Sequence, residues 1–180
     1  MLSTMKFSLD VKEGICLSEI RANDLTDFVR NLNDRDIYRT TARIPYPYRK
    51  SDGRKFFRLT RRATRKWGHP VHFAIRSESK ELIGVFGFDK LVYDHSAEIG
   101  YWLAKSYWNR GVMTGVVGTM CRYAVDAWNL VRIAARVREG NEASARVLAK
   151  NQFQLEGLLR KAERKDGQFF DMQTFSRIVD

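Results

Sequence analysis

The stretch from Ala97 to Met113 (AEIGYWLAKSYWNRGVM) constrains what this chain can fold into more than any other. Its first part has the character of a strand that ends near Ala104, and a short loop with Arg110 and Gly111 precedes a helix. The first N–H groups of a helix have no partner within it, and the helix dipole adds positive potential there. Gly111 would let the backbone approach a phosphate closely. The pattern therefore predicts an anion-binding turn between a strand and a helix.

Hydrophobic periodicity predicts helices and strands over the rest of the chain. Helices are expected at about Asp24–Leu32 (capped by Asn23-Asp24), from the cap Ser51-Asp52 to Trp67, at Met113–Trp128 and at Glu142–Lys150. Strands are expected at about Phe7–Val11, Ile15–Ile20, Val71–Arg76, Leu82–Lys90, Ala97–Ala104, Arg132–Arg138, Gly157–Glu163 and Phe169–Ile178. A loop is expected at Pro45 and Pro47, which resist regular structure. Short polar connectors favour an antiparallel meander in the middle of the chain, and the whole order favours the α+β class.

Length and composition fit a single domain over residues 1–180, because a chain of this length can bury a substantial core. The N-terminus has charged residues and lacks the apolar core of a signal peptide, and no apolar stretch is long enough to cross a bilayer. Cys16 and Cys121 have no metal-ligand spacing and are expected to be free thiols. These features predict a cytoplasmic protein that does not enter a membrane.

The net charge is +11, from 32 Lys and Arg against 21 Asp and Glu. This charge favours an anionic partner such as nucleic acid, a phosphorylated cofactor, a ribosome surface or an acidic peptide, and it disfavours a polyamine. The expected second helix has an apolar stripe of Phe56, Leu59, Ala63 and Trp67 and an opposite stripe of basic residues. The basic residues are Arg54, Lys55, Arg58, Arg61, Arg62, Arg65 and Lys66. Two interpretations stay open: docking to an acidic or RNA-rich surface, and a solvated face.

Five motifs occur in a characteristic order and spacing over nearly the whole chain. They are Ile44–Tyr48 (IPYPY), Glu98–Leu103 (EIGYWL), Tyr107–Gly111 (YWNRG), Asn141–Leu148 (NEASARVL) and Phe153–Gly157 (FQLEG). Together they resemble the GCN5-related N-acetyltransferases (GNAT), and within them the RimJ/RimL-like ribosomal-protein N-acetyltransferases. The resemblance implies a mixed, mostly antiparallel central sheet of about seven strands, splayed at the middle and flanked by four helices. It also implies transfer of an acetyl group from acetyl-coenzyme A (acetyl-CoA) to an amine.

The resemblance implies where acetyl-CoA binds. The family's phosphate loop falls on residues 108–113, and the backbone amides of 110–114 are expected to bind the pyrophosphate. The preceding strand is expected to splay from its neighbour, to bond pantetheine through the backbone of Leu103, and to offer an N–H to the thioester carbonyl. Asn141 matches an asparagine that opens the last helix and contacts the cofactor. The expected cofactor residues are Trp102, Leu103, Arg110, Gly111, Val112, Met113, Thr114, Gly115 and Asn141.

Three positions depart from the family's pattern. Trp108 replaces the usual Gln or Arg, and Gln152 stands where a glycine is usual. Met113 replaces a small residue and would crowd the loop unless its side chain turns into the core. Because the phosphate contacts come from the backbone, cofactor binding is expected to survive these changes.

Two residues are candidates for the proton transfers. Glu98, on the splayed strand, is expected to act as a general base or to orient the substrate. The tyrosine that many relatives use as an acid falls on Leu148, so the acid is expected at Ser144, three residues after Asn141, unless that serine only bonds to the helix. Cys121 lies among core residues of the third helix and is not expected to form an acetyl intermediate.

The acceptor is less constrained. Tyr46 and Tyr48 are expected to border it, with core packing as an equal alternative. A protein N-terminal α-amine of the ribosomal-protein-alanine type is expected, by direct attack on the thioester. The alternatives are a small-molecule amine (an antibiotic, amino acid or amino sugar), a non-catalytic ribosome- or nucleic-acid-binding module, and an inactive acyl-CoA-binding relative. Three scattered histidines predict no metal site, and a monomer and a homodimer both fit.

Overall fold

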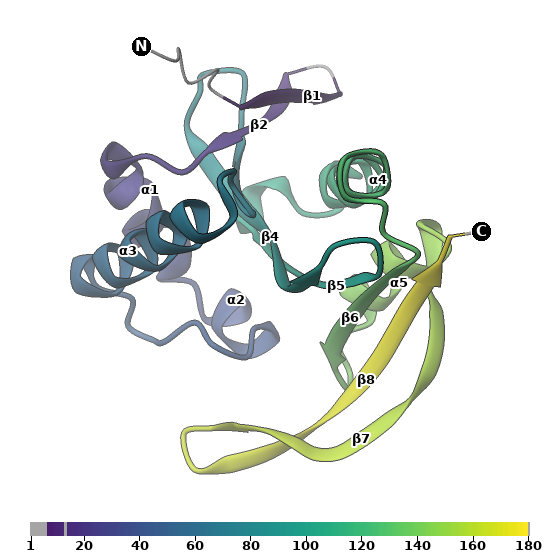
Figure 1. The fold of residues 1–180 in the computed structure, drawn as a ribbon. Helices are drawn as coiled ribbons and strands as arrows, with labels where there is room; N and C mark the ends of the chain where they lie inside the picture. The colour runs from purple at the N-terminus through teal and green to yellow at the C-terminus, as the bar shows by residue number, and fades with distance from the viewer. Residues whose placement is uncertain (1–6, 13, 180) are drawn as a thin grey trace.

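The computed structural model describes residues 7–12 and 14–179, which form eight strands, five α-helices and two short 3-10 helices (Figure 1). The strands are β1 (Ser8–Lys12), β2 (Ile15–Glu19), β3 (His72–Arg76), β4 (Leu82–Val92), β5 (Ser96–Leu103), β6 (Arg132–Arg138), β7 (Gln154–Lys165) and β8 (Gln168–Ile178). The helices are η1 (Ala22–Asp24), α1 (Leu25–Leu32), α2 (Arg35–Thr40), α3 (Lys50–Trp67), η2 (Lys105–Tyr107), α4 (Val112–Trp128) and α5 (Glu142–Lys150).

The eight strands of the described residues join in one sheet with the order β1-β2-β3-β4-β5-β6-β8-β7. Neighbouring strands are antiparallel, except that β5 and β6 are parallel. Parallel neighbours need a crossover connection, and α4 supplies it between β5 and β6. The expected antiparallel meander of β3, β4 and β5 is confirmed.

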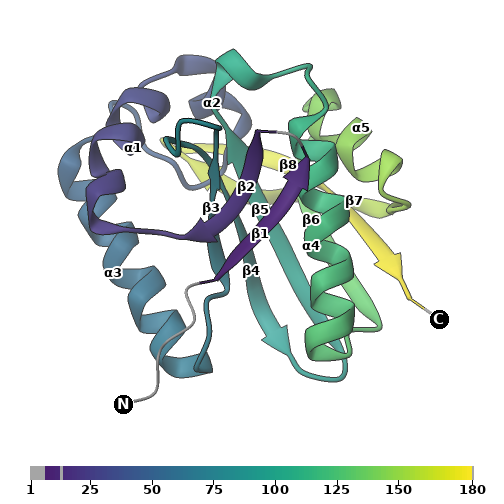
Figure 2. The same cartoon turned by 90° about the horizontal axis from the view of Figure 1, so that it is seen from above.

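Helices cover both faces of the sheet. In Figure 2, α1 and α3 lie to one side of the strands and α4 and α5 to the other. Alternation along β5 divides its side chains between two cores, with Ile99 in the core beneath α4 and Trp102 in the core that includes Phe28 of α1. No helix in the described part of the chain is long and apolar enough to cross a membrane.

The α+β class and the mixed, mostly antiparallel sheet are confirmed, with small differences in number. The described residues have the eight strands that periodicity predicts, where the family resemblance implies about seven, and five α-helices where four were expected. The additional helix is α2, which has only six residues and is capped by Asp34, whose carboxylate accepts from the N–H groups of Asp36 and Ile37. Because Ile37 is the only buried residue of α2, the helix has no periodic apolar face that the sequence could reveal.

Two residues expected to cap helices have different roles. The carboxylate of Asp24 is buried and accepts from both terminal nitrogens of Arg76, at 2.9 and 3.0 Å, which holds the start of α1 against β3. Removing one partner of such a buried pair costs about 3–5 kcal/mol. Helix α3 begins before its expected cap, so Asp52 lies in the first turn, where it accepts from the N–H of Arg49 at 2.8 Å.

Candidate active site

Strands β5 and β6 diverge from their middle onward. They pair only over Ser96–Ile99 and Arg132–Ala135. Beyond these residues, β5 stays paired with β4 as far as Leu103, and β6 stays paired with β8 as far as Arg138. The backbone N–H and C=O groups along the two diverging edges therefore have no strand partner. The splay expected from the sequence is present, and we refer to the opening as the wedge.

A cavity of about 1070 Å³ extends through the wedge and takes its lining from both sides of the sheet. This volume lies just above the range of about 300–1,000 Å³ that is typical of ligand sites. The expected site residues that line it are Tyr48, Glu98, Trp102, Leu103, Gly111, Val112, Met113, Thr114, Asn141 and Ser144. Tyr46, Arg110 and Gly115 do not line it. The fold thus brings most of the expected residues together around one space.

The N-terminus of α4 supplies backbone donors at one end of the cavity. Gly111 precedes the helix in the left-handed conformation (φ 70°), and a Cβ added there would meet no protein atom within 4 Å. The N–H groups of residues 112–114 belong to the first turn and have no partner within the helix. The N–H of Gly115 donates to the carbonyl of Gly111 at 3.1 Å, so Gly115 is not available to a ligand.

Trp108 fixes the loop that leads into α4. Its Nε1 donates to the carbonyl of Leu103 at 2.8 Å, so the tryptophan ties the loop to the end of β5. Met113 is buried in the core beneath α4 while still bordering the cavity, and its side chain does not crowd the turn. Arg110 lies outside the cavity, where its carbonyl accepts from Lys12 Nζ at 2.9 Å. The loop is therefore shaped by side chains that leave its backbone donors free.

Glu98 borders the cavity between two cations. Its Oε2 accepts from Lys90 Nζ at 2.7 Å, and its Oε1 accepts from Arg136 Nε at 3.0 Å. Burial alone would raise the pKa of Glu98, but the hydrogen bonds and charges of Lys90 and Arg136 outweigh it and hold the pKa below its ordinary value. Glu98 is therefore ionised at neutral pH and is a weaker base than a free glutamate.

A second carboxylate, which no sequence motif indicates, lies opposite Glu98. Asp89 on β4 is its cross-strand partner, so the two side chains share one face of the sheet. A hydrogen bond from His72, 3.5 Å away, lowers the pKa of Asp89 against the opposing effect of burial. A bulge between Asp89 and Val92, with Lys90 at φ 51°, shifts the register by one residue, so counting from the connector would have placed Lys90 opposite Glu98. Two ionised carboxylates thus border this side of the cavity.

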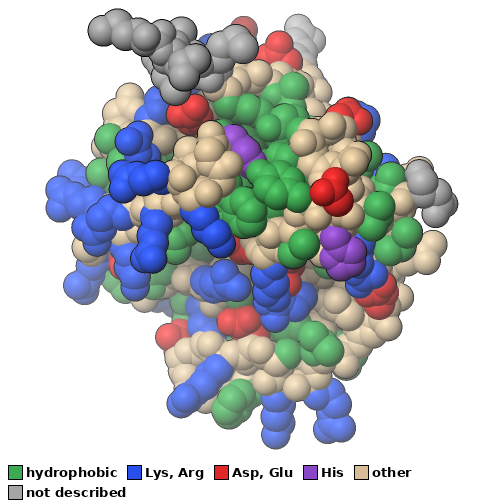
Figure 3. Space-filling model, in the orientation of Figure 1, with side chains coloured by type: hydrophobic (Ala, Val, Ile, Leu, Met, Phe, Trp, Pro, Cys, Tyr) green, Lys and Arg blue, Asp and Glu red, His purple; other side chains and the backbone are tan. Residues whose placement is uncertain are grey.

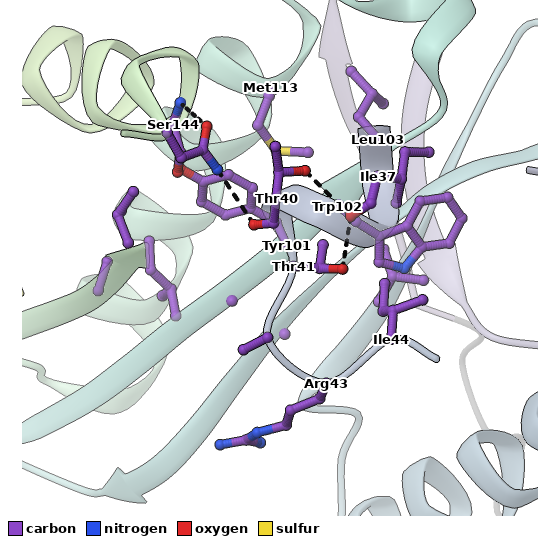
Figure 4. A pocket seen from close by; sticks show the side chains of 18 of the residues that line it. Ile37, Thr40, Thr41, Arg43, Ile44, Tyr101, Trp102, Leu103, Met113 and Ser144 are labelled. Atoms are coloured by element: carbon purple, nitrogen blue, oxygen red, sulfur yellow. Dashed lines mark hydrogen bonds between the residues drawn. The ribbon is translucent and has the colours of Figure 1, made fainter. Parts of the chain in front are cut away.

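Ser144 and Tyr101 meet on the other side of the wedge. Their hydroxyl groups are hydrogen bonded at 2.9 Å. Asn141 caps α5, because its Oδ1 accepts from the N–H of Ser144 at 3.2 Å, and its Nδ2 donates to the carbonyl of Thr40 at 3.3 Å (Figure 4). Burial raises the pKa of Tyr101 to about 12, so its hydroxyl stays protonated. The cap of α5 is therefore Asn141 and not Ser144. The hydroxyl of Ser144 bonds instead to Tyr101, a residue of the EIGYWL motif to which the sequence assigns no role.

The two tyrosines expected to border the acceptor lie apart. Tyr48 is buried and lines the cavity, with its backbone held by Asn33 through bonds of 2.9 and 2.8 Å. Burial raises the pKa of Tyr48 to about 12. Tyr46 is 40% exposed and packs against Tyr38 outside the cavity. Tyr48 therefore packs in the core and also forms part of the cavity wall, whereas Tyr46 does neither.

Residues Tyr38–Thr41, which we call the strap, connect the N-terminal helices to the C-terminal half of the chain. Arg138 donates to the carbonyl of Arg39 at 2.8 Å, and Asn141 donates to the next carbonyl of the strap. Lys165 donates to the first and last carbonyls of the strap. Burial and the nearby charge of Arg138 lower the pKa of Lys165 to about 8. These contacts join residues about a hundred positions apart, and no local pattern indicates them.

The cysteines do not contribute to the site. Cys16 and Cys121 are buried and free, as expected. Burial raises the pKa of Cys121 to about 12, so it is a poor nucleophile. Within residues 7–12 and 14–179, no group of three His, Cys, Asp or Glu side chains could hold a metal ion.

The splayed sheet and the glycine turn at a helix N-terminus define the class of protein. A family model described as Acetyltransferase (GNAT) domain matches residues 15–154, and the chain belongs to this family. The family and the fold expected from the sequence are therefore confirmed.

Similar proteins carry acetyltransferase names. A protein of Bacillus subtilis (strain 168) named as an uncharacterized N-acetyltransferase, YoaA, is 40% identical over 102 residues, which are 56% of this chain and 58% of that protein. A ribosomal-protein-serine acetyltransferase of Escherichia coli (strain K12) is 32% identical over 114 residues, 63% of each chain. The chain thus spans about three fifths of the length of the curated relatives it matches. A solved structure of RimL, a ribosomal L7/L12 α-N-protein acetyltransferase in complex with coenzyme A, shares the fold with a TM-score of 0.85 at 22% identity, over 97% of this chain and 99% of that chain.

Proposed function

We propose that this protein transfers the acetyl group of acetyl-CoA to the N-terminal α-amine of a protein, and that ribosomal proteins are its acceptors. One observation carries the proposal: the wedge between β5 and β6 connects the free N–H groups of α4 to the carboxylates of Asp89 and Glu98 within one cavity. A site for an anionic carrier and a site for a cationic amine thus meet at the open edge of β5.

The residues of the wedge fit coenzyme A. The backbone edge of Gly100–Leu103 that faces the wedge has no strand partner and offers hydrogen bonds to the amides of pantetheine, although the carbonyl of Leu103 already accepts from Trp108. The N–H groups of residues 112–114 and the dipole of α4 favour the pyrophosphate, which can approach closely at Gly111. Arg146 and Lys150 of α5 line the same cavity and add positive charge. Bound there, acetyl-CoA supplies an acyl group activated as a thioester.

Glu98 accepts the proton of the attacking amine, directly or through a water. An α-amine has a pKa of about 8, so its deprotonation at pH 7 costs roughly 1.4 kcal/mol, whereas a lysine side chain near 10.4 costs about 4–5 kcal/mol. A carboxylate whose pKa is lowered by Lys90 and Arg136 is a modest base. Such a base suits the deprotonation of an α-amine better than that of a lysine side chain. This difference favours an α-amine as the acceptor.

Ser144 donates a hydrogen bond to the departing thiolate, and the proton that Glu98 takes from the amine returns to the thiolate through solvent. Tyr101 stays protonated and can donate to Ser144 Oγ, which leaves the hydrogen of Ser144 free to point into the cavity. Asn141 fixes the backbone of Ser144 through its N–H. Tyr101 and Asn141 are thus positioning residues, and Ser144 is the group that contacts the leaving atom.

The ribosomal acceptor is supported by the names of similar proteins. The relative from Escherichia coli is named as a ribosomal-protein-serine acetyltransferase, and a second is named as a ribosomal-protein-alanine N-acetyltransferase. We therefore expect acceptor peptides that begin with serine or alanine to be preferred.

Calorimetric titration with acetyl-CoA tests the carrier site, and release of free thiol across a set of amines tests the reaction. We expect turnover with peptides that begin with serine or alanine, and none when their α-amine is blocked and only an internal lysine remains. Preference for a small amine such as an amino sugar would overturn the protein acceptor. Tight acetyl-CoA binding without turnover on any amine would refute the catalytic part.

A further inference from the structure

The solvent side of α3 carries the densest run of positive charge in the sequence. Residues 54–66 contain seven Lys or Arg and no Asp or Glu, and at about 100° per residue the seven fall within a sector of about 140°. All seven are exposed, and Figure 3 shows Lys and Arg side chains gathered over α3. We call them the basic face: Arg54, Lys55, Arg58, Arg61, Arg62, Arg65 and Lys66.

The charges of the basic face are not neutralised within the protein, and no other stretch of the sequence is as dense in positive charge. Some exposed cations elsewhere have partners, such as Arg30 with Asp27 and Arg132 with Glu156, and others stand singly. None of the ten ion pairs among the described residues involves the basic face. Like charges four residues apart on a helix, such as Arg54 and Arg58, destabilise it. The helix therefore maintains a repulsion that an anionic partner would relieve.

The packing of α3 separates this charge from the core. Gly53 and Thr60 are buried, and Phe56 and Phe57 pack against the core that contains Trp102. Leu59, expected on the apolar stripe, is 52% exposed and lies beside the basic face. The inner side of α3 thus holds the helix to the protein, and the basic face is free for another molecule.

We propose that the basic face binds the phosphate backbone of double-helical RNA. Arg54, Arg58, Arg61 and Arg65 form a row along the helix, with neighbours separated by about 5 Å and the whole row spanning roughly 16 Å. Guanidinium groups match phosphate oxygens with two hydrogen bonds each, which lysine cannot do, and five of the seven residues are arginine. A duplex presents regularly repeated phosphates to such a row, whereas the carboxylates of an acidic peptide have no fixed repeat.

The basic face lies next to the cavity that is proposed to receive the amine, so RNA binding there would affect which acceptors reach the site. Lys55 and Leu59 also line the acceptor cavity. RNA held by α3 therefore lies at the edge of the mouth that receives the amine. A protein bound to that RNA would have its N-terminus raised in local concentration at the site.

The test is RNA binding by fluorescence anisotropy at several salt concentrations, with an RNA hairpin whose stem has about 16 base pairs. We expect the variant with Arg58→Gln, Arg61→Gln and Arg65→Gln to bind at least about 10-fold more weakly and to reduce the slope of log affinity against log salt by roughly 3. Glutamine keeps a high helix propensity, so α3 should remain intact, which circular dichroism would check.

The matched control replaces three exposed arginines away from α3, with Arg122→Gln, Arg160→Gln and Arg164→Gln, and changes the net charge equally. The proposal requires this variant to bind RNA as the wild type does. Equal losses in both variants, or no RNA binding by the wild type, would overturn it. Displacement of the RNA by poly-glutamate at matched charge would assign the face to an acidic protein instead. Acetyl-CoA affinity should be the same in all three proteins, so a failure here is distinguishable from a failure of the proposed acetyl transfer.

Discussion

The two halves of the wedge are built on different principles. The half proposed to bind acetyl-CoA, which we call the carrier half, is formed by β5 and the start of α4 and offers backbone N–H and C=O groups whose positions follow from the secondary structure. The half proposed to bind the amine, which we call the acceptor half, is formed by the strap, Asp89, His72 and Tyr48 and offers side chains that come from separate parts of the chain. A backbone site tolerates side-chain changes such as Trp108 and Met113, and a side-chain site does not. We therefore expect the carrier to be common to relatives and the acceptor to vary.

The largest expected effect is the loss of activity on replacing Glu98, which should slow the reaction without weakening acetyl-CoA binding. Glu98→Gln should lower kcat/KM by roughly 100-fold near neutral pH, the lower end of the range for loss of a general base. The deficit should shrink at higher pH, where the α-amine is already neutral. Acetyl-CoA affinity, measured by calorimetry, should not change.

Glu163→Gln is the matched control, because Glu163 also lines the cavity but makes no bond to Lys90 or Arg136. A deficit of equal size at every pH from 6 to 9 would reduce Glu98 to an orienting carboxylate and end its assignment as the base.

The converse effect is expected at Gly111. Gly111→Val should weaken acetyl-CoA binding roughly 10- to 100-fold, the cost of one or two charge-assisted hydrogen bonds, because the side chain would occupy the space beside the free N–H groups. Gly68→Val is the control, since Gly68 has a similar φ of 77° and equally open surroundings at the end of α3. Both variants should lose similar stability, but only the first should lose affinity. Equal affinities would show that the phosphate site lies elsewhere.

A smaller effect should appear in the pH dependence of stability. The pKa of Lys165 is lowered from 10.5 to about 8, so the unfolded chain holds more protons than the folded protein between these values. The contribution of Lys165 to the free energy of unfolding should therefore rise as pH increases from 8 to 10.5, by about 1–2 kcal/mol after solvent screening. The raised pKa values of Cys121, Tyr48 and Tyr101 act in the opposite direction, so the contribution is measured as a difference between variants. In urea denaturation, the wild type and the surface control Lys50→Gln should gain stability relative to Lys165→Gln over this pH range. A difference that stays constant with pH would remove Lys165 as the cause.

The smallest effect concerns the turn after α5, where neither half of the wedge is touched. Gln152 has a φ of 66°, a conformation that costs a non-glycine residue about 1 kcal/mol. Gln152→Gly should raise the free energy of unfolding by about that amount and leave the rate unchanged. Gln154→Gly, in the extended strand β7, should instead be destabilising. Thermal melting of both variants checks that the first is more stable than the wild type and the second less stable.

The sequence predicts the carrier half better than the acceptor half because of the range of the interactions. The turn at Gly111 and the helix after it depend on neighbours in the chain, and local patterns indicate them, whereas Ser144 is indicated by the family resemblance. Asp89 meets Glu98 only through a bulge that changes register by one residue. The contact of Ser144 with Tyr101 joins two elements 43 positions apart, and the strap joins residues up to 127 positions apart. Hydrophobic periodicity carries no information about contacts between residues so far apart in the sequence.

The strap also has a consequence for biosynthesis. The carbonyl of Tyr38 is bonded by Lys165, the last residue of β7, so a chain emerging from the ribosome must present the whole of β7 before this contact of its acceptor half can form. Contacts between such distant segments form late in folding, because the intervening loop must first be ordered. The β-meander and α4 can assemble earlier from nearer neighbours. A nascent chain should thus acquire its affinity for the carrier before it acquires any selectivity for the amine.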